Sequence, residues 1–371
     1  MKILLVSEAR GVHESLYRGL IELGHDCEMA VLYYTPIAHV AHARDFHPMR
    51  KLRRIGRIIR PYINYWQLKD LPEYDVMSFV HRISFHDLNK FLQYSDLPLL
   101  TKKAMILSYT ALGCDEISLI KNNPDLPYNP CGDCERFDAT GQHCIQVVRK
   151  LHEKGISNLR KYFDVVISSM IEYDQVRSLF PGKAARIPLP IDISEIPWKP
   201  AQGIRLKLNI VHTPTRKGFK GTHIVLSAMR ILKERRSDFE FSMVEGLPFE
   251  EYTRVMETAD IVIDQIWSQS AGMNALWMLG MGKVVFSGNT ELCKAYFPFG
   301  NENPIINAPP DPEQLADSLE AVLRARAAIS DLSERGRNYI KKHHNHVSIA
   351  QQYVELWNKV GDRKVVQDDV S

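Results

Sequence analysis

The sequence predicts an α/β protein of two parallel-sheet domains that face each other across a cleft. The first observation is the length, because 371 residues favour two domains, or one large α/β barrel, over one ordinary core. The second is that short apolar runs alternate with stretches of helical period along the chain. The third is a proline-marked linker between two Rossmann-like halves of similar size: Pro188, Pro190, Pro197 and Pro200.

Composition and charge narrow the class of protein. Hydrophobic residues make up 45% and charged residues 25%, which excludes collagen-like, disordered and coiled-coil chains. The net charge of +3 does not require a nucleic acid, and we expect none as a partner. No apolar run reaches the ~18 residues of a membrane helix, and residues 3–6 are too short for a signal peptide. We therefore expect a cytoplasmic protein whose six cysteines are reduced or bind metal.

The first half begins with a strand, a helix and a strand, as an open parallel sheet does. Residues 2–6 form the first apolar run and residues 27–33 the second. Between them, one helical stripe precedes Gly24, a residue that suits a helix end: Val12, Leu16, Leu20 and Leu23. Further strands are expected at residues 74–81, 104–109 and 164–169, and a helix at 147–163.

Residues 48–68 form a basic, amphipathic stretch. Its cations alternate with apolar residues: Arg50, Lys51, Arg53, Arg54, Arg57 and Arg60 with Leu52, Ile55, Ile58 and Ile59. One interpretation is a helix with a solvated face. The other is a surface that meets anionic lipid or a phosphorylated acceptor. The second interpretation predicts peripheral contact with the inner face of the membrane through residues 50–60.

Residues 113–145 predict a long loop, because asparagine, proline and glycine recur and no period is evident. The loop contains a cysteine at its start, a C-x-x-C pair and a later cysteine beside His143: Cys114, Cys131, Cys134 and Cys144. These four thiols are candidates for a structural zinc site, with His143 as a substitute ligand. Inert free thiols and a redox pair are the alternatives.

The second half repeats the alternation of strands and helices. Strands are expected at residues 208–212, 239–244, 261–266, 284–287 and 305–306. Helices are expected at residues 222–233, 249–258, 272–281, 312–324, 332–343 and 347–360. Open parallel sheets bind ligands beyond the carboxyl ends of their strands, so the segments that follow strands are the candidate sites.

Three segments that follow strands carry distinctive residues. Residues 7–11 follow the first strand but lack the G-x-G-x-x-G spacing of a dinucleotide site. Residues 211–222 carry Arg216 and Lys220 between a strand and a helix, which indicates a diphosphate ligand; a solvated basic turn is the alternative. Residues 264–285 place small residues before a helix, where backbone N–H groups favour an anion.

At these residues the second half resembles the nucleotide-sugar domain of GT-B glycosyltransferases, in the large bacterial retaining group known as group 1. The matching pieces are Lys220-Gly221, residues 259–265 and residues 272–285. The resemblance implies an acceptor domain at residues 1–195 and a nucleotide-sugar domain at residues 196–345. It also implies a C-terminal helix within residues 346–371 that packs back on the first domain.

The resemblance further implies the chemistry. A UDP- or GDP-sugar would donate its sugar to a glycan, lipid-linked or other acceptor in cell-surface polysaccharide synthesis, without a catalytic metal. The implied catalytic candidates are Asp115, which lies beside Glu116 in the acceptor domain, and Gln269. The substrate-binding candidates are Gly11, His13, Arg216, Lys220, Glu245, Gln269, Ser270, Gly272, Met273 and Asn274.

Two positions depart from the pattern of that group. The group carries two glutamates with seven residues between them, and Gln269 and Trp277 stand at their places. A glutamine hydrogen bonds sugar hydroxyls without a charge, and a tryptophan accepts no hydrogen bond from a ribose. The departures keep two further hypotheses open: a non-catalytic subunit that binds glycan or nucleotide, and a sugar-nucleotide epimerase of the same fold.

Overall fold

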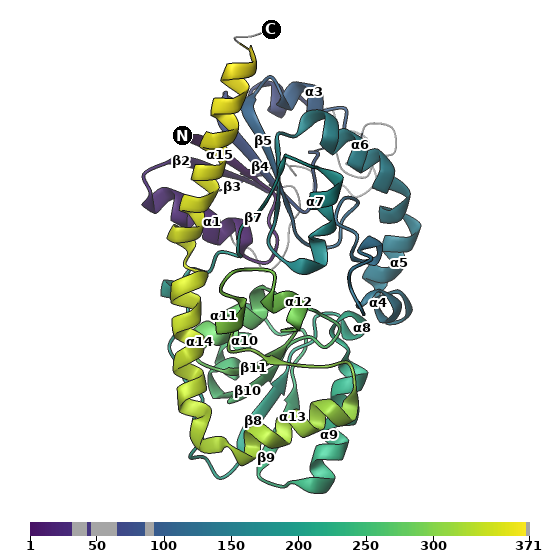
Figure 1. Cartoon of the computed structure of the whole chain (residues 1–371), viewed down its shortest axis with the longest axis vertical. Coiled ribbons are helices and arrows are strands. Elements are labelled where there is room, and N and C mark those ends of the chain that lie inside the picture. Colours follow the sequence, from purple (N-terminus) through teal and green to yellow (C-terminus); the bar gives the residue numbers. More distant parts are fainter. Residues whose placement is uncertain (32–42, 46–64, 86–92, 369–371) are drawn as a thin grey trace.

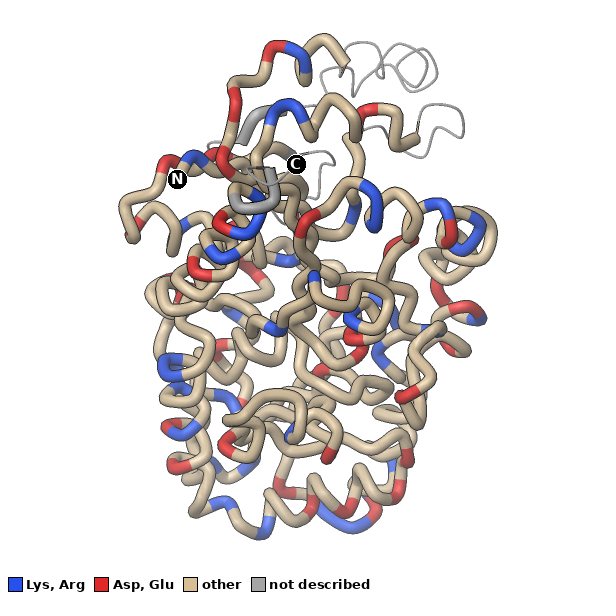
Figure 2. The backbone as a smooth tube through the Cα atoms, turned by 45° about the horizontal axis from the view of Figure 1, so that its top comes forward, with Lys and Arg blue, Asp and Glu red and all other residues tan. Residues whose placement is uncertain are grey.

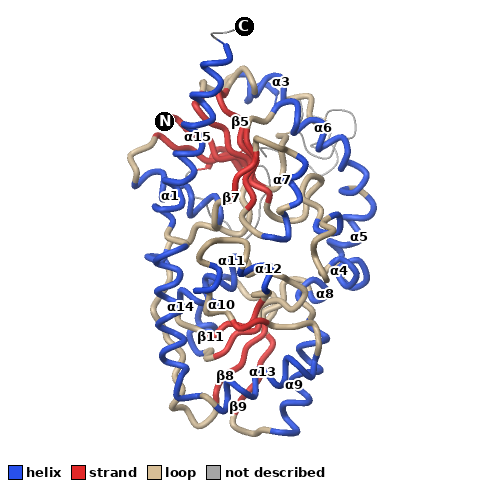
Figure 3. Tube along the Cα trace, in the orientation of Figure 1, coloured by secondary structure: helices blue, strands red, loops and turns tan. Residues whose placement is uncertain are grey.

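The computed structural model describes residues 1–31, 43–45, 65–85 and 93–368, which form two wholly parallel sheets enclosed by helices (Figures 1 and 3). Across the first sheet lie β3 (Ala43–Asp45), β2 (Asp26–Val31), β1 (Lys2–Val6), β4 (Tyr74–Val80), β5 (Ala104–Ala111), β6 (Val165–Ser168) and β7 (Ala184–Arg186). Across the second lie β12 (Ile306–Asn307), β11 (Val284–Ser287), β10 (Ile261–Ile263), β8 (Leu208–His212) and β9 (Phe239–Met243). The predicted class, two parallel-sheet α/β domains, is confirmed.

The helices follow the strands in alternation. The first domain has α1 (Val12–Glu22), α3 (Leu97–Leu100), α4 (Cys131–Phe137), α5 (Ala139–Gln146), α6 (His152–Tyr162) and α7 (Gln175–Leu179). The second has α8 (Lys217–Lys220), α9 (Thr222–Arg235), α10 (Phe249–Thr258), α11 (Met273–Met281), α12 (Glu291–Lys294), α13 (Pro312–Arg324) and α14 (Ile329–His343). The long α15 (His346–Asp368) ends the described chain. Short 3-10 turns occupy Ile120–Asn122, Val148–Leu151, Ile171–Tyr173, Ile193–Glu195, Gly300–Glu302 and Arg326–Ala328.

The strand orders place a topological switch point in each sheet. Chain order reverses between β1 and β4 in the first sheet and between β8 and β10 in the second. In open parallel sheets, the crevice at such a point is where ligands bind. The segments that follow these four strands therefore form the expected site edge of each domain.

The C-terminal helix α15 belongs to the first domain although it follows the second in sequence. Figure 1 shows the chain leaving α14 and running as α15 along the first domain. Trp357 and Tyr353 are fully buried against core strand residues such as Ile3. The Tyr353 hydroxyl also lies 3.2 Å from Thr110 Oγ1 on β5. The burial of these two aromatic side chains stabilises the packing of α15 on the first domain.

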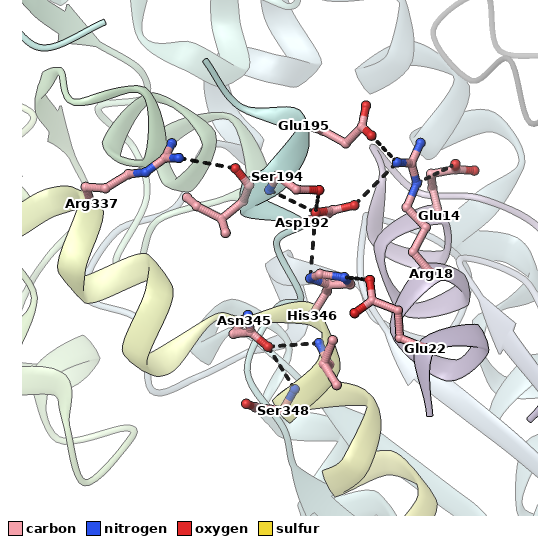
Figure 4. Close-up of polar contacts among 12 residues, drawn as sticks. Glu14, Arg18, Glu22, Asp192, Ser194, Glu195, Arg337, Asn345, His346 and Ser348 are labelled. Carbon is pink, nitrogen blue, oxygen red and sulfur yellow. Dashed lines mark hydrogen bonds and ion pairs between the residues drawn. The ribbon is translucent and has the colours of Figure 1, made fainter. Parts of the chain in front are cut away.

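Two chain crossings between the domains lie side by side and form the hinge (Figure 4). Ile191 of the linker bridges Asn345, at the junction of α14 and α15. Arg18 Nη1 of α1 donates to Asp192 Oδ2 at 3.3 Å. His346 Nδ1 lies 3.8 Å from Asp192 Oδ1. Because both crossings are joined to each other and to α1, the domains share one hinge on this side of the molecule.

A second joint between the domains lies on the other side, where α4 meets α8 (Figure 1). The expectation of a loop over residues 113–145 is wrong for its second part, because α4 and α5 are helical. Helices of seven and eight residues are too short to display a clear apolar period. The N–H groups of Gly218 and Phe219 donate to the Asp138 carboxylate at 3.1 and 2.8 Å. This contact joins the two domains.

Other expectations concern charge and membrane contact. Figure 2 shows basic and acidic positions intermixed over both domains. The predicted membrane-facing residues 50–60 lie outside the described residues. Within the described ranges, none of the helices combines the length and apolar character that crossing a membrane requires.

Candidate functional site

The turn after β1 is strained and tightly bonded. Ser7 and Arg10 have positive φ angles of 71° and 60°, which cost energy in residues other than glycine. The Glu8 carboxylate accepts the N–H groups of Gly11 and Glu14, at 2.7 and 2.8 Å. Burial raises the pKa of Glu8 to about 7. His81, directly after β4, also has a positive φ, of 70°. Backbone strain is therefore concentrated at the switch point of the first sheet.

The candidate His13 faces the interior. It is fully buried, its Nδ1 lies 2.9 Å from the carbonyl of Ser7, and burial lowers its pKa to about 4. A neutral imidazole in this position supports the strained turn. The candidate Gly11 has a φ of 90° and lies against the side chain of Met273 at the start of α11. This contact brings the strand-end turns of the two sheets together.

The basic segment after β8 contains two paired cations, Lys217 and Lys220, and one, Arg216, without an ion-pair partner among the described residues. Lys220 Nζ lies 2.6 Å from Asp264 Oδ1, and the Asn274 amide donates to the same oxygen at 2.7 Å. Arg216 stacks over the ring of Phe219 at 3.8 Å and has no ion-pair partner among the described residues. Partial burial and the nearby Arg216 charge lower the pKa of Arg10. Two arginines, one from each domain, are thus close enough for their charges to interact, and both could bind the same anion.

The candidate Glu245 lies on the loop after β9 and contacts the basic segment at Lys217. Its carboxylate pairs with Lys217 Nζ at 2.9 Å, and both side chains are about half exposed, at 45% and 52%. An exposed pair of this kind contributes little to stability. The structure does not bring Glu245 into contact with the other candidates.

The loop before α11 encloses a carboxylate from the first domain. Glu172 Oε1 accepts the backbone N–H groups of Gln269 and Ser270, at 2.8 and 2.9 Å. The hydroxyls of Ser268 and Ser270 donate to its two oxygens at 2.5 Å. Glu172 is 3% exposed. The loop around the candidate Ser270 is thus an anion-binding nest, and the side chain in it comes from the other domain.

The candidate Gln269 is sealed from solvent. Its side chain is fully buried, and its Nε2 donates to the carbonyl of Tyr128 at 3.0 Å. Trp277 is half-buried and packs edge-on against Phe249, with ring centroids 5.9 Å apart. Gly272 precedes the first residue of α11, so the candidates Gly272, Met273 and Asn274 sit at the positive end of that helix.

The candidate Asp115 organises a turn in the first domain. Its carboxylate accepts the N–H groups of Ile117 and Ser118 and the hydroxyl of Tyr109, at 2.9, 2.7 and 2.6 Å. Burial and the neighbouring Glu116 raise its pKa to about 7. Both carboxyl groups are buried, so they hold the chain after β5 in place.

One cavity of about 110 Å³ lies between the domains. The first domain contributes His81, Asp115 and all four candidate cysteines to its lining, and the second contributes Arg216 and Phe219. The predicted phosphate-binding residue Arg216 and the four predicted metal ligands therefore line the same cavity. Sequence reasoning placed them in separate sites because the chain gives no sign that α4 docks on α8.

Two interdomain residues, Glu172 and Asp138, were not among the predicted site residues. Glu172 follows β6, so the rule that ligands gather at strand ends could have drawn attention to it. Asp138 lies between two short helices and is buried in the fold, but no local pattern in the sequence distinguishes it from an exposed acid.

Comparison with known proteins decides the fold. No family model matches the sequence, and no curated protein matches it. Sucrose-phosphate synthase from Thermosynechococcus elongatus superimposes with a TM-score of 0.64 at 14% identity, over 97% of this chain and 99% of that one. The protein has the GT-B fold.

Two further GT-B structures match over nearly full length. HepE of Anabaena, solved with UDP and glucose, has a TM-score of 0.60 at 12% identity and covers 97% of this chain and 100% of its own. The catalytic domain of Arabidopsis thaliana starch synthase IV, solved with ADP and acarbose, has a TM-score of 0.65 at 10% identity. That match covers 98% of this chain and 99% of that one.

Proposed function

We propose that this protein is a glycosyltransferase that moves a sugar from a UDP- or GDP-sugar to a glycan, lipid-linked or other acceptor. We place it in cell-surface polysaccharide synthesis, on the cytoplasmic side of the membrane. The observation that carries the proposal is the meeting of two switch-point edges: Arg10 of one interacts electrostatically with Arg216 of the other, and Gly11 contacts Met273 at the positive end of α11. Its full-length likeness to structures solved with UDP and with ADP supports the same ligand class.

In this proposal the donor diphosphate lies beside Arg216 and the amino end of α11. Arg216 provides a charge-assisted, bidentate contact, and the helix end stabilises the developing negative charge. No catalytic metal is needed, because a guanidinium and a helix dipole stabilise the leaving diphosphate. Lys220 acts indirectly, because its ammonium is already bound to Asp264, which also holds Asn274 at the start of α11.

Donor binding requires the domains to separate. Ligand sites usually measure ~300–1,000 Å³, whereas the interdomain cavity that Arg216 lines measures about 110 Å³. The contacts that must open are those of Glu172 with the Ser268–Ser270 loop and of Asp138 with α8. The paired crossings at Asp192 and Asn345 would remain as the hinge.

The test is nucleotide binding to Arg216→Ala, measured by calorimetry with UDP and GDP. Losing one charge-assisted contact should weaken binding about 10-fold or more. Arg254→Ala, an exposed arginine on α10, is the matched control and should bind as wild type does. Wild-type affinity in Arg216→Ala would refute the placement of the diphosphate.

A second candidate function is a non-catalytic subunit that binds nucleotide or glycan. The observation in its favour is that Gln269 is fully buried against Tyr128, at the place where the group carries a donor-side glutamate. A screen of nucleotide sugars, with hydrolysis as readout, separates the two. Nucleotide binding without turnover of any donor would establish the subunit, and a changed sugar nucleotide without acceptor would establish an epimerase.

A further inference from the structure

Four of the six cysteines line one cavity between the domains. Cys114 follows β5, Cys131 and Cys134 lie on α4, and Cys144 lies on α5. Three separate segments thus bring their thiols to one space of about 110 Å³.

The grouping has the chemistry of a metal site. Thiolates are the preferred protein ligands of zinc, and a C-x-x-C pair on a helix presents both sulfurs on one face. A site of four thiolates and one Zn²⁺ carries two negative charges. Arg216 and Arg149 line the same cavity, and Arg149 also pairs with Glu135. These guanidinium groups would compensate the charge of the site.

We propose that the cavity binds one zinc ion through Cys114, Cys131, Cys134 and Cys144. As their side chains are placed, no three His, Cys, Asp or Glu residues of the described chain stand at distances that hold a metal. Binding therefore requires the four thiols to change rotamer and converge on one point, and a cysteine side chain has three staggered rotamers about its Cα–Cβ bond. Four protein ligands leave no open position, so the role is structural.

The zinc would order the first-domain side of the joint opposite the hinge, because all four ligands belong to that domain. The segment that would carry three of its ligands also docks on the second domain through two aspartates. Asp138 accepts the N–H groups of Gly218 and Phe219, and Asp133 accepts the indole N–H of Trp267 at 2.9 Å. Metal binding would therefore hold α4 and α5 in the form that contacts α8, whether or not the chain transfers sugar.

Metal analysis of the full chain, purified without chelator, tests the proposal. We expect about one zinc per chain in wild type and loss of zinc in the double variant Cys131→Ser with Cys134→Ser. Cys293→Ser is the matched control, because Cys293 lies on α12 outside the cavity, and it should keep its zinc. Replacement of zinc by Co²⁺ should produce sulfur-to-cobalt charge-transfer absorption in wild type and not in the double variant.

A measurement on wild type alone covers the case in which the double variant fails to fold. Titration with a mercurial reagent should release the zinc as four thiols react. A chain without zinc that shows six free thiols would overturn the proposal. So would a Cys114–Cys144 disulfide found by mass spectrometry, or iron with acid-labile sulfide in place of zinc.

Discussion

Glu172 offers the sharpest test of how the two domains are held together. Its carboxylate comes from the first domain and is surrounded by donors of the Ser268–Ser270 loop of the second. Glu172→Ala removes the acceptor from two backbone N–H groups that the structure buries. The two serine hydroxyls can rotate to other partners, and the amides cannot.

The expected cost follows from these contacts. A buried donor left without an acceptor costs ~1–3 kcal/mol, so two amides give about 4 kcal/mol for Glu172→Ala in the closed form. Glu172→Gln keeps an acceptor oxygen toward the amides and loses only the charge. Since charge-assisted hydrogen bonds are about twice as strong as neutral ones, this variant should cost about 1–2 kcal/mol.

The assay combines urea unfolding with small-angle X-ray scattering. Unfolding reports the free energy lost, and scattering reports whether the domains separate before they unfold. Glu291→Ala, whose side chain is 87% exposed on α12, is the control and should match wild type in both. Glu172→Ala within about 1 kcal/mol of wild type, with an unchanged radius of gyration, would refute the reasoning.

Four further predictions follow from the described contacts. Burial raises the pKa of Glu8 from 4.5 to about 7, so wild type loses stability as pH rises between those values. Glu8→Gln, compared with wild type by urea unfolding from pH 4.5 to 7.5, should gain about 2 kcal/mol relative to it, allowing for the partial exposure of Glu8. Trp357→Ala should lower the free energy of unfolding by about 3–5 kcal/mol in the same assay, because the indole of this α15 residue is fully buried against the first sheet. Gln269→Glu should lose about 1–3 kcal/mol, since a carboxylate oxygen would replace the amide that donates to the carbonyl of Tyr128; wild-type stability would contradict this contact. Trp277→Phe should retain wild-type thermal stability to within a few degrees while Trp277→Glu melts at lower temperature, if the indole serves packing against Phe249.

Local patterns determined much of the architecture. The apolar runs at residues 2–6 and 208–212 coincide with β1 and β8, and the stretch at residues 249–258 coincides with α10. Strand and helix periods are properties of neighbouring residues, so a single sequence displays them. The placement of Arg216 at a strand end was also predictable, because strand ends are sites by topology.

Short elements escaped the sequence because they carry too few residues for a period to repeat. The strand β7 has three residues, and α4 and α5 have seven and eight. Their structure depends on what they pack against. Gly141, for example, would place a Cβ 2.0 Å from the carbonyl oxygen of Cys134, so only glycine allows α5 to approach α4.

The pairing of distant groups was decided by the tertiary structure alone. Glu172 and Gln269 are 97 residues apart, and nothing near either of them in sequence indicates that the carboxylate accepts that backbone N–H. The same holds for Lys220, which the sequence offers as a free phosphate ligand and the fold binds to Asp264. The sequence by itself determined which residues can bind anions. Only the folded chain decided which of those groups are already bound to each other, because burial and partner choice arise from contacts between segments and not within them.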